Sequence, residues 1–273
     1  MALAAPFLPN PAYLSASTQT DGIRFATNPV EAPVDSKRTA IEGADLVSRP
    51  VLTQRSDTVL SNGAQAHAQI EASMGVLKGK LSAHYERAFD TDSGWVDTRF
   101  STSFEDFIEV TAPGLSAGTP ITYTFSLTID GTSGVTPLPA APGALGVGFA
   151  ASMGPAFLSP VPRLRQIDWQ MSQGDGTFSQ TFEAVVGELL RVRGTLFAGA
   201  QAGTQNGTSD AWADYMSTAR FTLTPDVAGA NTVSVSGHDY AVSAVPEPTT
   251  AVLFVMGLLY ALAALRGKWP HLD

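Results

Sequence analysis

Acidic residues offer the simplest route to chemistry in this 273-residue chain, because glycoside hydrolysis needs only two carboxylates at a defined separation. Glu105, Asp106 and Glu109 form one cluster in the sequence, and Glu183 and Glu188 form another. Sequence spacing alone does not place either cluster across a cleft, and solvent-facing positions are the ordinary location of such residues. A polysaccharide hydrolase that uses such a pair is therefore kept as an alternative interpretation.

The sequence contains no other pattern that indicates a catalytic or metal-binding site. The chain has no cysteine, no Gly-Xaa-Ser-Xaa-Gly motif, and four histidines that form no helical zinc pattern: His67, His84, His238 and His271. The segment Asp90 to Gly94 begins like a calcium loop, but Ser101 stands where an EF-hand needs its closing glutamate. We predict no catalytic residue, no metal ligand and no cofactor, with a looser calcium site, including Asp97, as the alternative.

Aromatic side chains could instead bind sugars, since their rings stack on pyranose faces while neighbouring polar groups hold the hydroxyls. Trp95 and Trp212 lie in polar, loop-like surroundings, and Tyr215 follows close behind Trp212. Trp169 is in phase with Ile167 and Met171, which indicates a core position. We therefore take Trp95, Trp212 and Tyr215 as candidate ligand-binding residues.

The elements that position these residues are predicted to be strands. Large apolar side chains occupy every second position from Ile121 to Ile129, and alanine alternates with polar residues from Ala64 to Ala72. Asp130 and Gly131 suggest a hairpin turn after the first of these strands, 232–235 suggests a short strand, and only 210–219 suggests a helix. Gly and Pro recur about every ten residues, which favours an all-β, antiparallel β-sandwich or jelly-roll-like domain.

Composition divides the chain into three parts. Residues 1–60 are rich in proline and predict an extended arm or edge strands, and residues 61–245 predict the β-sandwich domain. The 16 basic and 25 acidic residues give a formal charge of −9, which argues against nucleic acid as a partner.

The third part, residues 246–268, has the layout of a sorting tail. Val245, Pro246, Glu247 and Pro248 precede an apolar run from residue 251 to 265, which predicts a transmembrane helix, and Arg266 follows it. This layout resembles the PEP-CTERM sorting signal, which is recognised by an exosortase. The resemblance implies export, transient anchoring in the inner membrane, cleavage near the motif, and release to the cell surface or extracellular matrix.

Four looser patterns are similar to passenger domains that precede this tail. They are Phe104 to Ile108, Gly114 to Gly118, Ala213 to Ala219, and a Ser-Gly-Xaa-Xaa-Tyr pattern at Ser236 to Tyr240. Ala2 to Ala4 resembles the small-residue box before a signal-peptidase site, so we expect a secretion signal encoded upstream of Met1. The main interpretation is an exported, non-enzymatic protein that binds or organises exopolysaccharide. An inert structural surface protein remains a further alternative.

Overall fold

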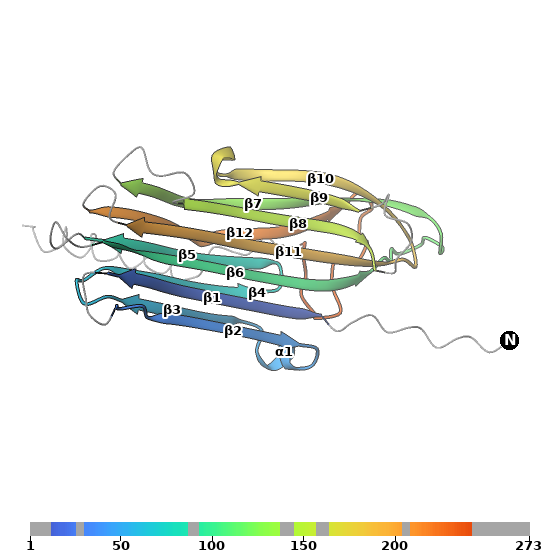
Figure 1. Cartoon of the computed structure of the whole chain (residues 1–273). Helices are drawn as coiled ribbons and strands as arrows, with labels where there is room; N and C mark the ends of the chain where they lie inside the picture. The colour runs from blue at the N-terminus through green and yellow to red at the C-terminus, as the bar shows by residue number, and fades with distance from the viewer. Residues whose placement is uncertain are drawn as a thin grey trace, which may run out of the picture. The chain divides into compact units, whose positions relative to one another are not determined.

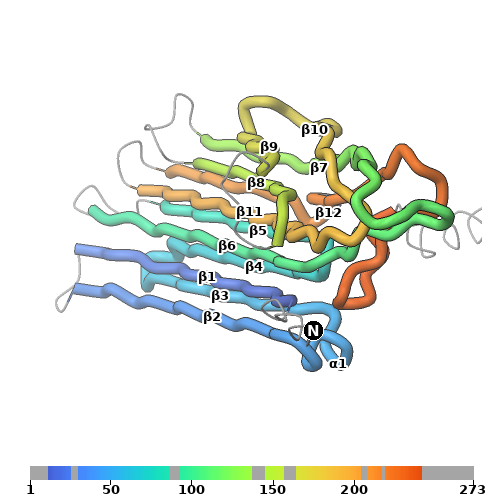
Figure 2. Tube along the Cα trace, turned by 90° about the vertical axis from the view of Figure 1, so that its right-hand side faces the viewer, coloured from blue at the N-terminus to red at the C-terminus, as the bar shows by residue number. Residues whose placement is uncertain are grey.

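The computed structural model of the chain describes residues 12–25, 30–86, 93–136, 145–156, 164–203 and 208–241. Most of these residues lie in antiparallel strands that form two layers, which Figures 1 and 2 show from two directions. One sheet, called sheet A, has the strand order β2-β1-β6-β11-β8-β9, and the other, sheet B, has the order β10-β7-β12-β5-β4-β3. The predicted β-sandwich is therefore confirmed.

The elements have the following bounds. The strands are β1 Tyr13–Arg24, β2 Val34–Glu42, β3 Leu52–Val59, β4 Gln65–Ser73, β5 Val76–Tyr85, β6 Gly94–Glu109, β7 Pro120–Thr136, β8 Leu145–Pro155, β9 Arg165–Gln170, β10 Gly176–Val185, β11 Leu189–Gly203 and β12 Ser209–Pro225. One turn of helix, α1 Asp45–Ser48, follows β2, and a 3₁₀ turn, η1 Met171–Gln173, follows β9.

The core lies between the two sheets and is built from alternate residues of each strand. In β7 the five apolar residues at odd positions from Ile121 to Ile129 are each at most 2% exposed. Phe221 of the neighbouring strand β12 lies 5.9 Å from Phe125 between ring centroids, and 6.0 Å from Phe104 of the opposing sheet. The predicted alternation and its inward face are confirmed.

The prediction of an N-terminal arm separate from the sandwich domain is wrong. Residues 13–59 form β1, β2 and β3, and they belong to the same compact unit as the rest of the chain to Ala241. β2 and β3 are edge strands, which agrees with the predicted edge strands. β1, however, lies inside sheet A between β2 and β6. Leu14 and Ala16 in β1 are buried in the core, so no domain boundary falls at residue 60.

Three local predictions were also wrong. Residues 210–219 belong to β12 and not to a helix, because Ala211, Ala213 and Tyr215 alternate into the core and tertiary burial outweighs the helix propensity of alanine. β7 continues through Asp130 and Gly131 without a turn. Gly131 instead lets the Tyr215 ring approach the backbone closely, since a methyl group there would lie 2.2 Å from Tyr215 Cδ1. Residues 232–235 make one isolated bridge, Val233 to Asp239, within the C-terminal loop.

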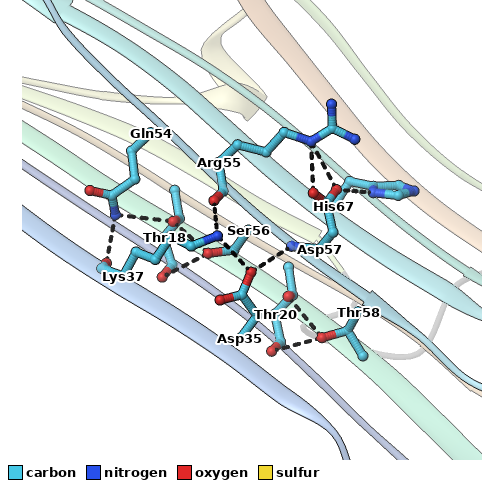
Figure 3. A network of polar contacts seen from close by, with 10 residues as sticks. All are labelled: Thr18, Thr20, Asp35, Lys37, Gln54, Arg55, Ser56, Asp57, Thr58 and His67. Atoms are coloured by element: carbon cyan, nitrogen blue, oxygen red, sulfur yellow. Dashed lines mark hydrogen bonds and ion pairs between the residues drawn. The ribbon is translucent and has the colours of Figure 1, made fainter.

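Side chains close the sandwich along the edge where β2 and β3 face each other, as Figure 3 shows. The Lys37 amine donates to the Arg55 carbonyl at 2.6 Å, and the Asp57 amide donates to Asp35 Oδ2 at 3.1 Å. Gln54 Nε2 donates in return to the Lys37 carbonyl at 2.6 Å. The edge backbone of each sheet is thus capped by side chains from the other, which protects both edges from pairing with another chain.

Behind this edge the interior is polar. Thr18 Oγ1 and Ser56 Oγ lie 2.7 Å apart, and the hydroxyls of Thr20 and Thr58 lie 2.9 Å apart, all four residues being at most 3% exposed. These bonds join β1 of sheet A to β3 of sheet B and satisfy hydroxyls that burial would otherwise penalise.

The sorting tail lies outside the described residues, and so do Val245, Pro246, Glu247, Pro248 and Arg266. Among the described residues, no helix has the length and apolar character that crossing a membrane requires. The predicted transmembrane helix and sorting motif remain predictions.

Candidate functional site

The three candidate aromatic residues do not form one site. Trp212 lies on the outer face of sheet B and is 40% exposed, whereas Trp95 is half-buried on the outer face of sheet A. Tyr215 points into the core, is 3% exposed, and lies edge-on to Trp169 at 5.6 Å between ring centroids. Tyr215 is therefore a core residue, and its assignment as a ligand-binding residue is wrong, while Trp169 is in the core as predicted.

The Trp212 ring is held against a glycine of the neighbouring strand. Trp212 is paired with Gly134 of β7, and a methyl group at Gly134 would lie 3.0 Å from the indole atoms Cε2, Cζ2 and Nε1. Ala211 and Ala213, on either side in β12, are buried, so the indole projects from the sheet into solvent. The ring is thus seated on backbone and still accessible.

Two acid–base pairs flank this ring along the strand. Asp210 Oδ1 lies 2.6 Å from His84 Nδ1, and Asp214 Oδ2 lies 3.3 Å from Lys80 Nζ. The Ser82 side chain lies between the two pairs on β5, because Ser82 is the direct partner of Trp212. We call Trp212 with Ser82 and these two pairs the Trp212 face. It combines an apolar ring with donors and acceptors on both sides, which is the chemistry that holds a sugar ring by stacking and by its hydroxyls.

Neighbouring strands extend the polar surroundings of the Trp212 face. His67 of β4 pairs with Ser82, and its Nδ1 lies 2.6 Å from Asp57 Oδ1 on β3. Arg55 Nε donates to the other Asp57 oxygen at 2.8 Å. Desolvation by itself would raise the pKa of Asp57, but the hydrogen bonds from Arg55 and His67 together outweigh it, so the pKa is lowered. His67 faces outward on its strand, as predicted, and takes part in this surface network.

The sequence cluster of carboxylates does not form a catalytic pair. Asp106 points inward and is fully buried, while Glu105 and Glu109 project from the other face of β6. Glu109 is exposed there, but Glu105 is only 8% exposed, so it is not a solvated residue either. Asp106 Oδ2 accepts hydrogen bonds from Ser236 Oγ at 2.6 Å and from the Tyr240 hydroxyl at 3.1 Å. The expectation of a solvated Asp106 is wrong, because the C-terminal loop folds over it and supplies two hydroxyl donors.

We call Asp106, Ser236 and Tyr240 the C-terminal clasp. Two of the loose sequence patterns, Phe104 to Ile108 and Ser236 to Tyr240, thus meet in the structure. A pocket of about 240 Å³ lies beside the clasp and is lined by Leu46, Pro50, Met74, Ser236, Gly237 and His238. Burial lowers the pKa of His238, whose ring lies edge-on to Tyr240 at 4.5 Å.

The outer face of sheet A carries residues that sequence reasoning missed. Phe197 of β11 is 50% exposed and lies against Gly148 of β8, where a methyl group would be 2.4 Å from Phe197 Cζ. Further along the same face, Asp21 of β1 and Asp97 of β6 stand directly opposite each other. Burial and the charge of Asp21 raise the pKa of Asp97. Strand pairing creates both arrangements, so spacing in the sequence gives no signal for them.

The alternative calcium site gains no support from the described part of the chain. Asp90 and Asp92 lie outside it, and within it no three His, Cys, Asp or Glu side chains come together as metal ligands would. Asp97 instead faces Asp21 and lies two residues from Arg99.

Comparison with known proteins adds little. No family model and no curated protein matches the chain. Among solved structures, the chain is similar to TmCBM61, a structure determined in complex with beta-1,4-galactotriose, with 12% identity over 52% of this chain and 81% of that one. The TM-score is 0.22, which is too low to support an argument about a shared site.

Proposed function

We propose that this protein is an exported, non-enzymatic β-sandwich that binds polysaccharide through the Trp212 face. The observation that carries the proposal is the seating of Trp212: an indole held against Gly134, 40% exposed, between the Asp210–His84 and Asp214–Lys80 pairs. A ring fixed in this way binds a sugar face with little loss of side-chain freedom. The acid–base pairs on either side supply acceptors and donors for sugar hydroxyls.

The sorting part of the proposal rests on the sequence alone. The tail from Val245 to Arg266 resembles a PEP-CTERM signal, so an exosortase is the proposed processing partner and the inner membrane a transient location. Delivery to the cell surface or extracellular matrix would place the Trp212 face among polysaccharide chains. An inert structural protein would keep the same fold but would not need an exposed ring on a polar sheet.

Affinity electrophoresis of the full chain tests the binding proposal. Gels contain one neutral polysaccharide each, namely a β-glucan, a galactan or a mannan, and retardation gives the dissociation constant. Trp212→Ala should weaken binding by about tenfold or more, since a lost stacking contact of about 1.4 kcal/mol has that effect. Gly134→Ala should weaken it less, because its methyl group displaces the indole by only a few tenths of an ångström.

Val47→Ala is the matched control, because Val47 is 78% exposed in α1 and far from the Trp212 face in sequence and in strand pairing. Equal retardation of Trp212→Ala and Val47→Ala would remove Trp212 from the site. Release of reducing ends by the wild-type chain from any of these polysaccharides would favour the hydrolase instead. Absence of binding to all of them would favour the inert structural protein.

A further inference from the structure

A second aromatic ring stands exposed on the opposite side of the sandwich. Phe197 projects from sheet A because its strand neighbours Leu196 and Ala198 are buried. It lies against Gly148, and at the neighbouring Gly146 no atom of the described residues comes within 4 Å of the position a side chain would take. The Phe197 ring therefore projects above neighbouring glycines that carry no side chain.

This stretch of small side chains continues along the strands to Trp95. The next outward residue of β11 is Gly199, where a methyl group would meet, within the described ranges, only the Thr98 carbonyl at 3.8 Å and Arg99 Cβ at 3.9 Å. Trp95 lies six residues before Ser101, the β6 partner of Phe197, which is about 20 Å at about 3.3 Å per residue. Trp95 and Phe197 thus bracket a strip that is shallow where Gly148 and Gly199 carry no side chain.

The strip is polar between the two rings. Arg99, Asp97 and Gln201 project from its centre, and Asp21 of β1 lies directly opposite Asp97. A strip with rings at two points and hydrogen-bonding groups between them suits an extended chain of sugars. It suits a protein partner poorly, because a stable protein interface needs about 800 Å² per partner with an apolar centre.

The Trp212 face and this strip belong to one rigid framework. β11 and β12 contact each other across the sandwich, and they are drawn in adjacent layers in Figure 1. Phe197 points outward from sheet A, and Trp212 points outward from sheet B. A single sugar ring therefore cannot contact both Phe197 and Trp212.

We propose that the strip between Phe197 and Trp95 is a second polysaccharide-binding surface, which lets one molecule hold two polysaccharide chains together. This inference rests on the proposed function, because it assumes that the Trp212 face binds polysaccharide. The ligand on the strip is a neutral polysaccharide. Asp21 and Asp97 lie opposite each other there, and the nearby cation Arg99 already lies 3.9 Å from Asp21 Oδ2. Because the chain also carries a formal charge of −9, an acidic polymer would meet net repulsion.

Bead bridging tests the inference. Two populations of beads carry different dyes and are both coated with the neutral polysaccharide that the full chain binds best among a β-glucan, a galactan and a mannan. The wild-type chain should join the two colours into mixed clusters. Phe197→Ala and Trp212→Ala should each still coat single beads but lose mixed clusters by about tenfold or more. The double variant should not coat beads.

Two further variants sharpen the test. Gly148→Ala should also reduce clusters, because its methyl group would force the exposed Phe197 ring aside without entering the core. Val34→Ala is the control, since Val34 is 64% exposed on the edge strand of the same sheet. Beads coated with polygalacturonate should give fewer clusters than the neutral beads.

The outcomes separate this inference from the proposed function. If Phe197→Ala forms as many mixed clusters as the wild-type chain, the second surface is refuted. The second surface is also refuted if Trp212→Ala binds no polysaccharide at all. Neither result contradicts the proposed function. A lower sedimentation mass of Phe197→Ala would show that the ring joins two copies of the chain, which also overturns it. If the wild-type chain coats no beads, both proposals fail together.

Discussion

The C-terminal clasp gives the sharpest prediction about stability. Asp106 is fully buried, and its two oxygens accept three hydrogen bonds: from Ser236 Oγ at 2.6 Å, from the Tyr240 hydroxyl at 3.1 Å, and from the Phe107 amide at 2.9 Å. Asp106→Ala removes the acceptor and leaves the Tyr240 hydroxyl buried without it. An unsatisfied buried group costs about 1 to 3 kcal/mol, and the lost bond from Ser236 adds to this.

We therefore expect Asp106→Ala to lower the free energy of unfolding by about 2 to 4 kcal/mol. Removal of a buried charge offsets part of the loss, which is why the value stays below the sum of the individual bonds. Asp106→Asn keeps one acceptor oxygen in the same place and should lose about half as much. The assay is equilibrium unfolding in urea, followed by circular dichroism.

Glu109→Ala is the matched control, because Glu109 has the same charge on the same strand but is exposed. It should change the free energy of unfolding by less than about 0.5 kcal/mol. Equal midpoints for Asp106→Ala and Glu109→Ala would refute the clasp as a stabilising contact.

Three further predictions follow from other parts of the chain. Gly194→Ala should cost about 1 to 3 kcal/mol in urea unfolding, because its methyl group would lie 2.4 Å from Cε1 of the fully buried Phe104, whereas Gly148→Ala, which meets an exposed ring, should cost almost nothing. Burial raises the pKa of Tyr123 to about 12, so its contribution to stability is complete below about pH 10 and is lost as the pH rises towards 12. Tyr123→Phe should flatten that alkaline decline, and an unchanged slope would contradict the assignment. Alanine at all of 246–248 should leave full-length protein in the inner membrane, while the natural chain yields a shorter form; intact-mass measurement on native cells that finds only chains ending at Asp273 would refute the sorting assignment.

The strands were predictable where large apolar residues alternate, as in β7, because the period of two directly reflects which face is buried. Prediction failed in β12, although the alternating alanines of β4 were correctly interpreted as the inward face of a strand. In β12 the inward residues near Trp212 are alanines, and alanine alone does not distinguish a strand from a helix. Gly131 was interpreted as a turn residue, but its absence of a side chain makes room for Tyr215 from the next strand.

The site was predictable only in part for a related reason. Trp212 was a candidate because a tryptophan side chain can stack on a sugar, and the structure places it at the surface. Its neighbours His84 and Lys80 could not be predicted, since they are more than 120 residues away in the sequence. The same applies to Asp106, whose partners lie on a loop 130 and 134 residues later. Such contacts depend on strand order and register, which local patterns do not encode.

Footprinting of the exposed tryptophan tests the central claim most directly. The full chain is oxidised by hydroxyl radicals with and without a saturating neutral polysaccharide, and mass spectrometry measures oxidation in each peptide. We expect polysaccharide to protect Trp212 from oxidation several-fold, while Val47 reacts equally in both samples. Unchanged oxidation of Trp212 at saturation would contradict the claim that this face binds polysaccharide.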